Sequence, residues 1–243
     1  MYEKEINELK GAIENARNIC VFTGAGISCP SGIPDFRSAD GLYNSDGVGH
    51  FSPEEIISHS FFVKNTEMFY EFYKSKMMYP EAKPNKAHIC FSELEKKGKR
   101  VSIVTQNIDG LHTDAGNSEI YELHGSIRRN YCLNCGAFYD YKYVYNSKGI
   151  PVCEKCGGTV KPDVVLYEEG LDDKTVNGAI NAIASADLLI IVGTSLAVYP
   201  AASFLQFFRG ETVALINKSA TPFDKKAKIV INDDIIKVVN SLL

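Results

Sequence analysis

The chain has 243 residues, of which 45% are hydrophobic, so it can bury the core of one globular body with a subsidiary module. Its formal net charge is -4, and 30 Asp and Glu outnumber 26 Lys and Arg. No general electrostatic attraction to nucleic acid is therefore expected, and a basic partner such as a lysine-rich protein segment suits the chain better.

The sequence also bears on location. The N-terminal segment lacks the basic start and apolar run of a secretory signal, and no later apolar stretch has the length of a membrane span. The seven cysteines are an odd set, which argues against a disulfide framework. We expect a cytoplasmic protein with no membrane partner; the oligomeric state stays open, with a monomer slightly favoured.

The predicted elements alternate between helices and strands. Residues 3–17 carry apolar side chains at helical spacing, and residues 18–23 form a short, apolar, partly β-branched run. Further strand-like runs lie at 101–105, 187–192, 212–216 and 228–231, with helix-like stretches between several of them. This order is typical of an α/β fold with a parallel, Rossmann-like sheet.

A glycine-containing loop, residues 23–28, directly follows the first predicted strand. Glycines there permit a tight turn and let backbone N–H groups approach a diphosphate, but a Gly-x-Gly after a strand is often an ordinary turn. Cys29 occupies the third position of the dinucleotide fingerprint, and no ribose-binding acid follows at about twenty residues. A hydride-transfer enzyme is therefore disfavoured.

Polar and aromatic residues continue the pattern. Phe36 offers a flat face for a planar ring and Arg37 a fork for phosphate or carboxylate, unless this loop is an ordinary surface turn. Three later strands end in polar segments, 105–109, 193–196 and 216–218. Ligands of open parallel sheets bind beyond these strand ends, although any one of the residues could equally cap a helix.

Four cysteines predict a metal site. Cys132, Cys135, Cys153 and Cys156 form a C-x2-C-x17-C-x2-C array with zinc-ribbon spacing. Four thiolates leave no coordination position for water, so the zinc is predicted to be structural, with iron, redox thiols or plain buried cysteines as alternatives. The segment from 128 to 161 has no dense basic face, which makes a nucleic-acid-binding ribbon a minor interpretation.

Taken together, the motifs resemble the sirtuins, NAD-dependent protein lysine deacylases, in their bacterial type. The matching segments are 24–28, 32–37, 105–109, 123–125, both cysteine pairs, 161–165, 193–196 and 216–217. The resemblance implies that an acyl-lysine oxygen attacks the nicotinamide ribose of NAD and that nicotinamide leaves. A ribose hydroxyl, deprotonated by a histidine, then attacks the adduct, and water completes the release, so the products are nicotinamide, free lysine and O-acyl-ADP-ribose.

The resemblance also implies residue roles. His124 is the catalytic base, and an imidazole with an unperturbed pKa of about 6.5 suits that task. Asn107 would hold the ribose, and Asp109 with Ile108 would bind the nicotinamide carboxamide; a helix cap is the alternative for Asp109. The rest of the implied NAD site is Gly24, Ala25, Gly26, Cys29, Asp35, Phe36, Arg37, Gln106, Gly193, Thr194, Ser195, Asn217, Asp234 and Ile235. His88 and His112 are expected to be structural.

The substrate side of the resemblance rests on the extended run 162–167. Val165, Leu166 and Tyr167 would form one wall of a cleft to which an acyl-lysine peptide adds as a strand, unless the run is simply a core strand. The family usually has glycine where this chain has Glu168, which leaves the loop and its peptide affinity uncertain. Tyr73 stands where members that prefer acidic acyl groups carry arginine, so acetyl, with longer apolar acyl groups as a further option, is expected over succinyl.

The sequence thus predicts a discontinuous NAD-binding domain of residues 1–37, 86–125 and 163–243, a helical module of 38–85 and a zinc-binding module of 126–162. The predicted function is NAD-dependent deacetylation of protein lysines, with one structural zinc. A protein mono-ADP-ribosyltransferase, and a non-enzymatic NAD sensor or zinc-ribbon adaptor, are the alternatives. A further hypothesis is that a helix N-terminus lowers the pKa of Cys29 and makes it sensitive to oxidation.

Overall fold

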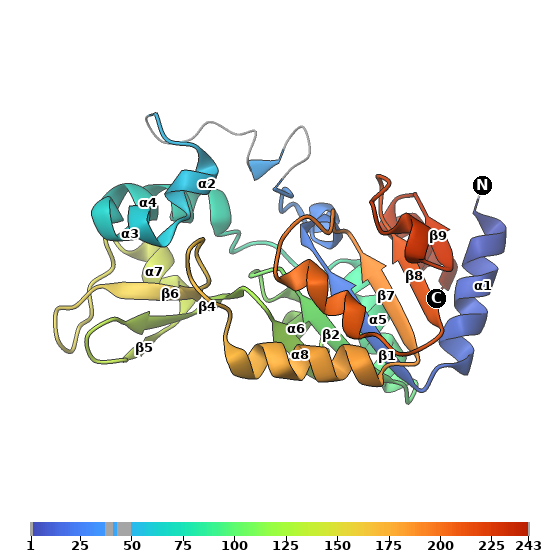
Figure 1. Cartoon of the computed structure of the whole chain (residues 1–243). Coiled ribbons are helices and arrows are strands. Elements are labelled where there is room, and N and C mark those ends of the chain that lie inside the picture. The colour runs from blue at the N-terminus through green and yellow to red at the C-terminus, as the bar shows by residue number, and fades with distance from the viewer. Residues whose placement is uncertain (1, 37–40, 43–49, 243) are drawn as a thin grey trace.

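The computed structural model describes residues 2–36, 41–42 and 50–242. Figure 1 shows a larger lobe built on a twisted sheet and a smaller lobe of short helices and strands beside it. The large sheet has the order β3-β2-β1-β7-β8-β9, and every neighbouring pair in it is parallel. The predicted α/β class with a Rossmann-like parallel sheet is confirmed.

The strands of the large sheet are β1 (Asn18–Thr23), β2 (Arg100–Thr105), β3 (Glu119–Glu122), β7 (Leu188–Val192), β8 (Thr212–Ile216) and β9 (Ile229–Ile231). Its helices are α1 (Glu3–Asn15), η1 (Ala25–Ile27), η2 (Cys29–Ser31), α5 (Lys86–Lys96), α6 (Leu111–Asp114), α8 (Asp173–Ser185), η5 (Ala201–Phe207), η6 (Asp224–Lys226) and α9 (Ile235–Leu242). The runs predicted at 18–23 and 212–216 match β1 and β8, whereas the edge strand β3 was not predicted.

Both faces of this sheet are buried, because successive side chains of a strand point to opposite sides. Ile19 and Val21 of β1 belong to the core under α1, α5 and α9. Cys20 and Phe22 belong to the opposite core, under α8 and η5. The middle of β1, from Ile19 to Phe22, is apolar on both faces because it lies between two helical layers.

The small lobe combines both predicted modules. It contains α2 (Pro53–Ile56), α3 (His59–Lys64), α4 (Thr66–Phe72), the π-helical turn η4 (Tyr73–Met77), β4 (Gly125–Cys132), β5 (Phe138–Tyr139), α7 (Tyr141–Asn146) and β6 (Val160–Val164). The strands form an antiparallel sheet of order β5-β4-β6. Phe69 and Phe72 share one apolar core with Val144 and Val160, so the helices and the cysteine segment stabilise each other.

Two histidines lie in the interior of the large lobe, as structural contacts. The rings of His88 and His112 are 4.8 Å apart between centroids, and His112 Nε2 lies 3.2 Å from Thr23 Oγ1. Burial lowers the pKa of His88 to about 4. Burial, with the neighbouring His88, lowers the pKa of His112 to about 3. Both imidazoles are therefore neutral near pH 7.

These lowered pKa values predict how stability depends on pH. An unfolded histidine takes up its proton near pH 6.5, so each buried one costs about 1.4 kcal/mol of stability per pH unit as pH falls from there towards the folded pKa. His88→Gln keeps a side chain that can accept from the Asn85 N–H, as His88 Nδ1 does at 3.3 Å. Denaturant unfolding between pH 6 and 4.5 should show a slope smaller by about 1.4 kcal/mol per pH unit in this variant.

The matched control for this test is His50→Gln, because His50 is exposed. Its slope should equal that of the wild type. Equal slopes in all three proteins would contradict the interpretation that His88 is held neutral in the folded state.

Among the described residues, none of the helices combines the length and the apolar character needed to cross a bilayer.

Candidate active site

The loops that follow β1 and β7 pack backbone against backbone at the carboxyl edge of the sheet. The Gly24 N–H donates to Val192 O at 3.1 Å, and the Gly26 N–H donates to Gly193 O at 2.8 Å. A Cβ on Gly26 would lie 2.8 Å from Gly193 Cα, and one on Gly193, where φ is 61°, would lie 2.4 Å from Ile27 N. These two N–H groups donate to the facing strand end and loop. The sequence had predicted that they approach a diphosphate, and this contact between loops was not predicted.

A hydrogen-bonded triad lies beside this contact. Ser28 Oγ donates to Asp109 Oδ2 at 2.7 Å, and Asn107 Nδ2 donates to Ser28 Oγ at 3.1 Å. The other carboxylate oxygen of Asp109 accepts the Leu111 N–H at 2.9 Å, at the start of α6. Asp109 thus accepts from the first residue of α6 with one oxygen and from Ser28 with the other, although the N-cap residue of α6 is Gly110. Ser28 was not among the predicted site residues.

These residues line a cavity of about 200 Å³. Of the predicted cofactor-binding residues, it brings together Ala25, Phe36, Asn107, Ile108 and Asp109. The rest of the wall consists mostly of residues not predicted from the sequence: Ser28, Ile33, Pro34, Leu42, Lys76, Met77, Met78, Tyr79, Pro80, Ala82, Leu111, Asp114, Ile127, Arg128 and Tyr141. Apolar side chains around a polar triad suit a planar ring that carries an amide.

His124 directly precedes β4. Its Nδ1 lies 2.8 Å from Gln106 O, and because a carbonyl can only accept, Nδ1 carries the proton and Nε2 is left with a lone pair. Burial lowers the pKa of His124, and the hydrogen bond to Gln106 O opposes this shift in part. The imidazole is therefore neutral near pH 7 and able to accept a proton at Nε2.

Gln106 connects His124 to the loop after β7. While its carbonyl oxygen accepts from His124, its side-chain Nε2 donates to Thr194 Oγ1 at 3.1 Å. Thr194 is buried and its hydroxyl also accepts the Leu196 N–H at 3.1 Å, whereas Ser195 is exposed. One residue thus couples the histidine to the predicted phosphate-binding loop.

Asn217, Asp234 and Ile235, which were also predicted to bind NAD, follow β8 and β9 at the opposite end of the sheet from β3. Asn217 Nδ2 donates to Ser219 O at 2.8 Å, and Asp234 pairs with Lys218 Nζ at 3.2 Å. The Ile235 side chain belongs to the core, so only its backbone could meet a ligand. Arg37 lies outside the described residues.

Cys29 differs from the hypothesis of a reactive thiol. Burial, together with the nearby Asp35 carboxylate, raises the pKa of Cys29 instead of lowering it. The Sγ atom lies 3.7 Å from Ala25 O and 4.0 Å from Asp35 Oδ2, both of which are acceptors that favour the protonated thiol. Burial and the acidic neighbour both favour the thiol over the thiolate, which opposes the lowered pKa that the hypothesis of a reactive Cys29 assumed.

The predicted substrate wall lies between the lobes. The Val165 N–H donates to His124 O at 3.0 Å, which places this segment next to the histidine. Leu166 is buried in the small-lobe core, as the core-strand alternative proposed. Tyr167 is half-exposed, its N–H donates to Ile57 O at 3.0 Å and its carbonyl oxygen accepts the His59 N–H at 2.9 Å.

The four cysteines come together at the end of the small lobe's sheet. Their Sγ atoms all lie within 4.8 Å of one another, with Cys132 and Cys153 buried and Cys135 and Cys156 exposed. Tyr139 Oη donates to Cys153 Sγ at 3.2 Å, and the Asn134 N–H donates to Cys132 Sγ at 3.4 Å. Four clustered sulfurs with donors directed at them match the ligand shell of a structural zinc.

A protein-family model described as the Sir2 family matches residues 24–200. The chain belongs to the Sir2 family. It is 57% identical over 242 residues to the NAD-dependent protein deacetylase of Clostridium perfringens, covering 99% of each protein. It is 44% identical over 243 residues to the Staphylococcus epidermidis protein of the same name, covering 100% of this chain and 98% of that protein.

Solved Sir2 structures agree with this assignment. One, a complex with deacetylated p53 peptide and 3'-O-acetyl ADP ribose, superposes with a TM-score of 0.89 at 34% identity and covers 98% of this chain and 96% of that one. Another, with p53 peptide and NAD+, has a TM-score of 0.85 at 34% identity and covers 97% and 95% of the two chains. Both of the relatives named above are NAD-dependent protein deacetylases, and the cysteine quartet of this chain has the ligands and spacing of a zinc site.

The quartet generates a test of the metal's role. Cys135→Ser removes a thiolate from a closed four-ligand shell, so bound zinc should fall from about one ion per chain to a small fraction of that. The small lobe should lose stability with it, because Cys132 and Cys153 belong to its apolar core. Elemental analysis and thermal unfolding measure the two effects.

Cys29→Ser is the control, since it removes a thiol outside the quartet and should keep its zinc. Full zinc content in Cys135→Ser, or a wild-type protein purified without zinc that is equally stable, would contradict the structural role.

Proposed function

We infer that this chain is an NAD-dependent protein lysine deacetylase that transfers the acyl group to ADP-ribose. The observation that carries the inference is the neutral His124, whose Nδ1 is held by Gln106 O and whose Nε2 is free to act as a base. Bound NAD supplies the ADP-ribose acceptor when its nicotinamide leaves. The products are nicotinamide, free lysine and O-acyl-ADP-ribose.

We assign the polar triad to NAD. Asp109, with the backbone of Ile108, would receive the nicotinamide carboxamide within the cavity, and Asn107 would hold the ribose. Ser28 keeps both side chains in place through its two hydrogen bonds. The site also comprises Gly24, Ala25, Gly26, Cys29, Asp35, Phe36, Arg37, Gln106, Gly193, Thr194, Ser195, Asn217, Asp234 and Ile235.

His124 acts after nicotinamide has left. Its Nε2 would take the proton of a ribose hydroxyl, whose oxygen then attacks the acyl carbon of the lysine–ribose adduct; the C–N bond to lysine breaks and one water completes the release of free lysine. The carbonyl of Gln106 stabilises the imidazolium that forms, because it accepts the Nδ1–H throughout. The zinc takes no part in this step, since four cysteines leave no position for a reacting water.

The substrate is an acyl-lysine segment of a protein. Val165, Leu166 and Tyr167 would form its wall, because Val165 is hydrogen-bonded to the backbone of His124. We further propose the division into an NAD-binding domain (1–37, 86–125, 163–243), a helical module (38–85) and a zinc-binding module (126–162). A cytoplasmic monomer is part of the same proposal, in keeping with the absence of a disulfide among the described residues.

Replacement of the base tests this function. His124→Ala should lower kcat for an acetyl-lysine peptide by at least about 100-fold, because proton transfer by a positioned base contributes that much or more. Zinc content and NAD binding should persist, since no described contact of the His124 side chain reaches the zinc ligands. Mass spectrometry of the peptide and of O-acetyl-ADP-ribose measures the reaction, with His50→Ala as the control.

The same assay separates the alternative functions. ADP-ribose that accumulates on protein while the peptide keeps its acetyl group would indicate a transferase, and absence of nicotinamide release would indicate a sensor. Loss of zinc in His124→Ala would show that the histidine holds the fold instead of the chemistry.

The acyl preference follows from the small-lobe core. Tyr73 is fully buried there, and Tyr70 Oη donates to Val160 O, so this pair presents no cation to a distal carboxylate. We predict that kcat/KM for an acetyl-lysine peptide exceeds that for its succinyl counterpart by at least about tenfold, the scale of one missing charge-assisted hydrogen bond.

A butyryl peptide is the matched control, because butyryl and succinyl chains have the same length and differ in the terminal carboxylate. Butyryl should be removed faster than succinyl. Faster turnover of succinyl than of acetyl would refute the prediction.

A further inference from the structure

The segment that follows the substrate wall contains an unusual backbone conformation. Glu168 has φ of 76°, in the left-handed region that side chains other than glycine rarely occupy. Such a conformation persists only where the surrounding contacts enforce it. The contacts of Glu168 therefore show what this segment gains by having a side chain at that position.

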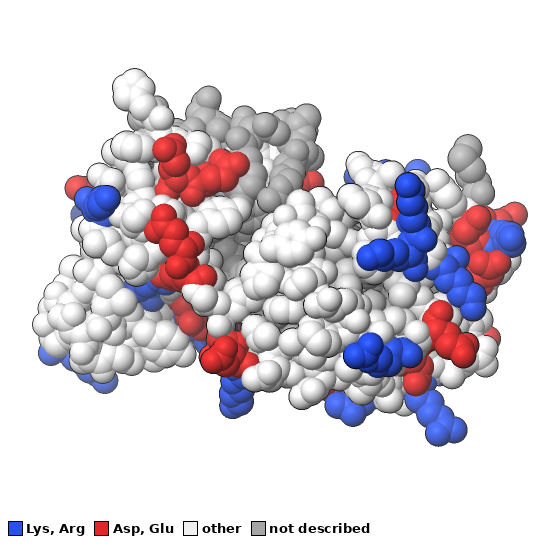
Figure 2. Space-filling model, in the orientation of Figure 1, with Lys and Arg blue, Asp and Glu red and all other residues white. Residues whose placement is uncertain are grey.

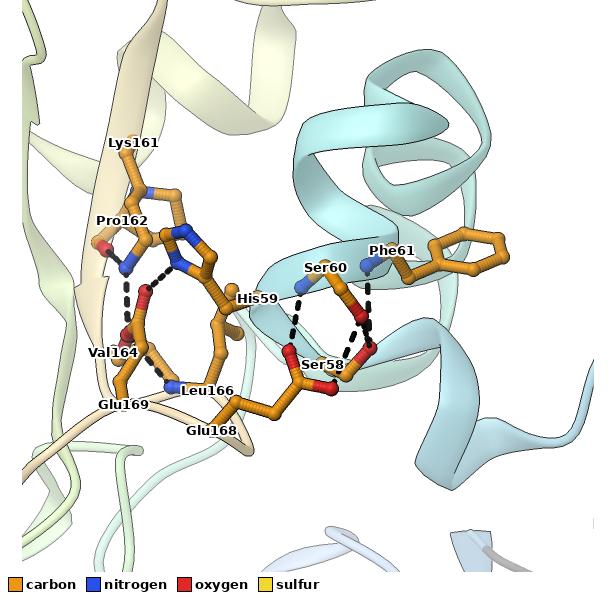
Figure 3. Close-up of polar contacts among 10 residues, drawn as sticks. All are labelled: Ser58, His59, Ser60, Phe61, Lys161, Pro162, Val164, Leu166, Glu168 and Glu169. Atoms are coloured by element: carbon orange, nitrogen blue, oxygen red, sulfur yellow. Dashed lines mark hydrogen bonds and ion pairs between the residues drawn. The ribbon is translucent and has the colours of Figure 1, made fainter.

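The Glu168 carboxylate binds the first turn of α3. Its Oε2 accepts the Ser60 N–H at 2.8 Å, and its Oε1 accepts the Ser60 hydroxyl at 3.0 Å (Figure 3). N–H groups in the first turn of a helix have no partner within the helix, and an anion is favoured at that end. The glutamate thus satisfies a donor that glycine could not.

Glu169 adds a second connection to the same helix. Its Oε1 lies 2.9 Å from His59 Nδ1, and its Oε2 accepts from the Leu166 N–H at 2.9 Å and from Lys161 Nζ at 3.2 Å (Figure 3). Although burial raises the pKa of Glu169, hydrogen bonds from these donors outweigh it, and the pKa is lowered. The adjacent carboxylates of Glu168 and Glu169 therefore bind two adjacent residues, Ser60 and His59, at the start of α3.

Between these connections and His124 lies the substrate wall. The Tyr167 backbone is bonded to Ile57 O and to the His59 N–H, so the two glutamates reinforce a junction already formed by the main chain. At its other end, Val165 is bonded to the backbone of His124. The position of this wall relative to the catalytic base therefore depends on how firmly residues 166–169 are attached to α3.

We propose that Glu168 is a positioning residue that fastens the acyl-peptide-binding segment Val165–Tyr167 to α3 through Ser60. This rests on the proposed function, in which that segment binds substrate. The carboxylate keeps the segment in its binding conformation before the peptide arrives, so the peptide need not order it. The left-handed backbone at residue 168 is what directs the side chain onto α3.

A competing explanation is that Glu168 acts through its charge alone. It lines a surface hollow with the acidic residues Glu54 and Glu55 and the rings of Phe51 and Phe61. Figure 2 shows acidic side chains gathered on the side of the small lobe that faces the large lobe. A purely electrostatic role in attracting basic peptides would make these glutamates interchangeable, whereas the proposed role belongs to Glu168 and depends on Ser60.

Three single variants distinguish the two explanations. Glu168→Gly removes the carboxylate and relieves the left-handed backbone, so the chain should fold as well as the wild type while KM for an acetyl-lysine peptide rises about three- to tenfold. Glu168→Gln keeps an oxygen for the Ser60 N–H and should stay within about twofold of the wild type. Glu54→Gln removes the same charge from the hollow, outside the contacts with Ser60, and should leave KM unchanged.

The kinetic readouts separate positioning from general damage. In Glu168→Gly, kcat at saturating peptide and KM for NAD should both change by less than about twofold, because neither His124 nor the NAD cavity loses a contact. A fall in kcat with an unchanged peptide KM, or equal effects of Glu168→Gln, Glu54→Gln and Glu168→Gly, would overturn the proposal.

The double variant tests the route through Ser60. Ser60→Ala removes one of the two contacts and should raise peptide KM less than Glu168→Gly does, and Glu168→Gly/Ser60→Ala should match Glu168→Gly alone. Independent, multiplying effects would overturn the proposal. If the wild type deacetylates the peptide and Glu168→Gly has the same peptide KM, only this inference is rejected. If the wild type does not deacetylate the peptide at all, the proposed function is rejected.

Discussion

The backbone contact between the loops after β1 and β7 is the constraint on which the site depends. Gly26 donates to Gly193 O at 2.8 Å, and neither residue has space for a Cβ. Two loops that approach this closely fix each other's path, because a main chain cannot adjust as a side chain can. The triad of Ser28, Asn107 and Asp109 is built next to this fixed junction, so its orientation follows from the packing of glycine on glycine.

The same junction is connected to His124, the proposed base, through a short chain of polar contacts. Thr194, directly after Gly193, accepts from the Gln106 side chain, and the Gln106 carbonyl holds His124 Nδ1. The Gln106 carbonyl can only accept, so it sets the tautomer of His124, and the side chain of the same residue connects it to the loop after β7. Burial then lowers the pKa of His124 and keeps Nε2 unprotonated at neutral pH.

Features that depend on residues close together in the chain could be predicted from the sequence. Features that depend on contacts between distant residues could not. Strands β1 and β8 were predicted to the residue because apolar, β-branched runs require burial on both faces. Strand β3 was missed because Glu119 and Glu122 flank only two apolar residues, and all four are half-buried at the sheet edge. Residues such as Met77 and Tyr79 in the cavity wall were also missed, since they meet the triad only through the fold.

Local sequence motifs predicted which residues would form the site, but not which groups those residues contact in the fold. The sequence showed that Glu168 replaces a glycine, which predicted a disturbed loop; Ser60, 108 residues away, turns that disturbance into an attachment. In the same way, a lowered pKa was expected for Cys29 beside a short helix, but burial and the Asp35 carboxylate raise the pKa of its thiol. A side chain's effect on its surroundings is set by the groups that face it, and most of those come from distant parts of the chain. At Glu168 the left-handed backbone and the two hydrogen bonds of the carboxylate occur together. A residue that departs from the family pattern can therefore attach a loop to a neighbouring helix.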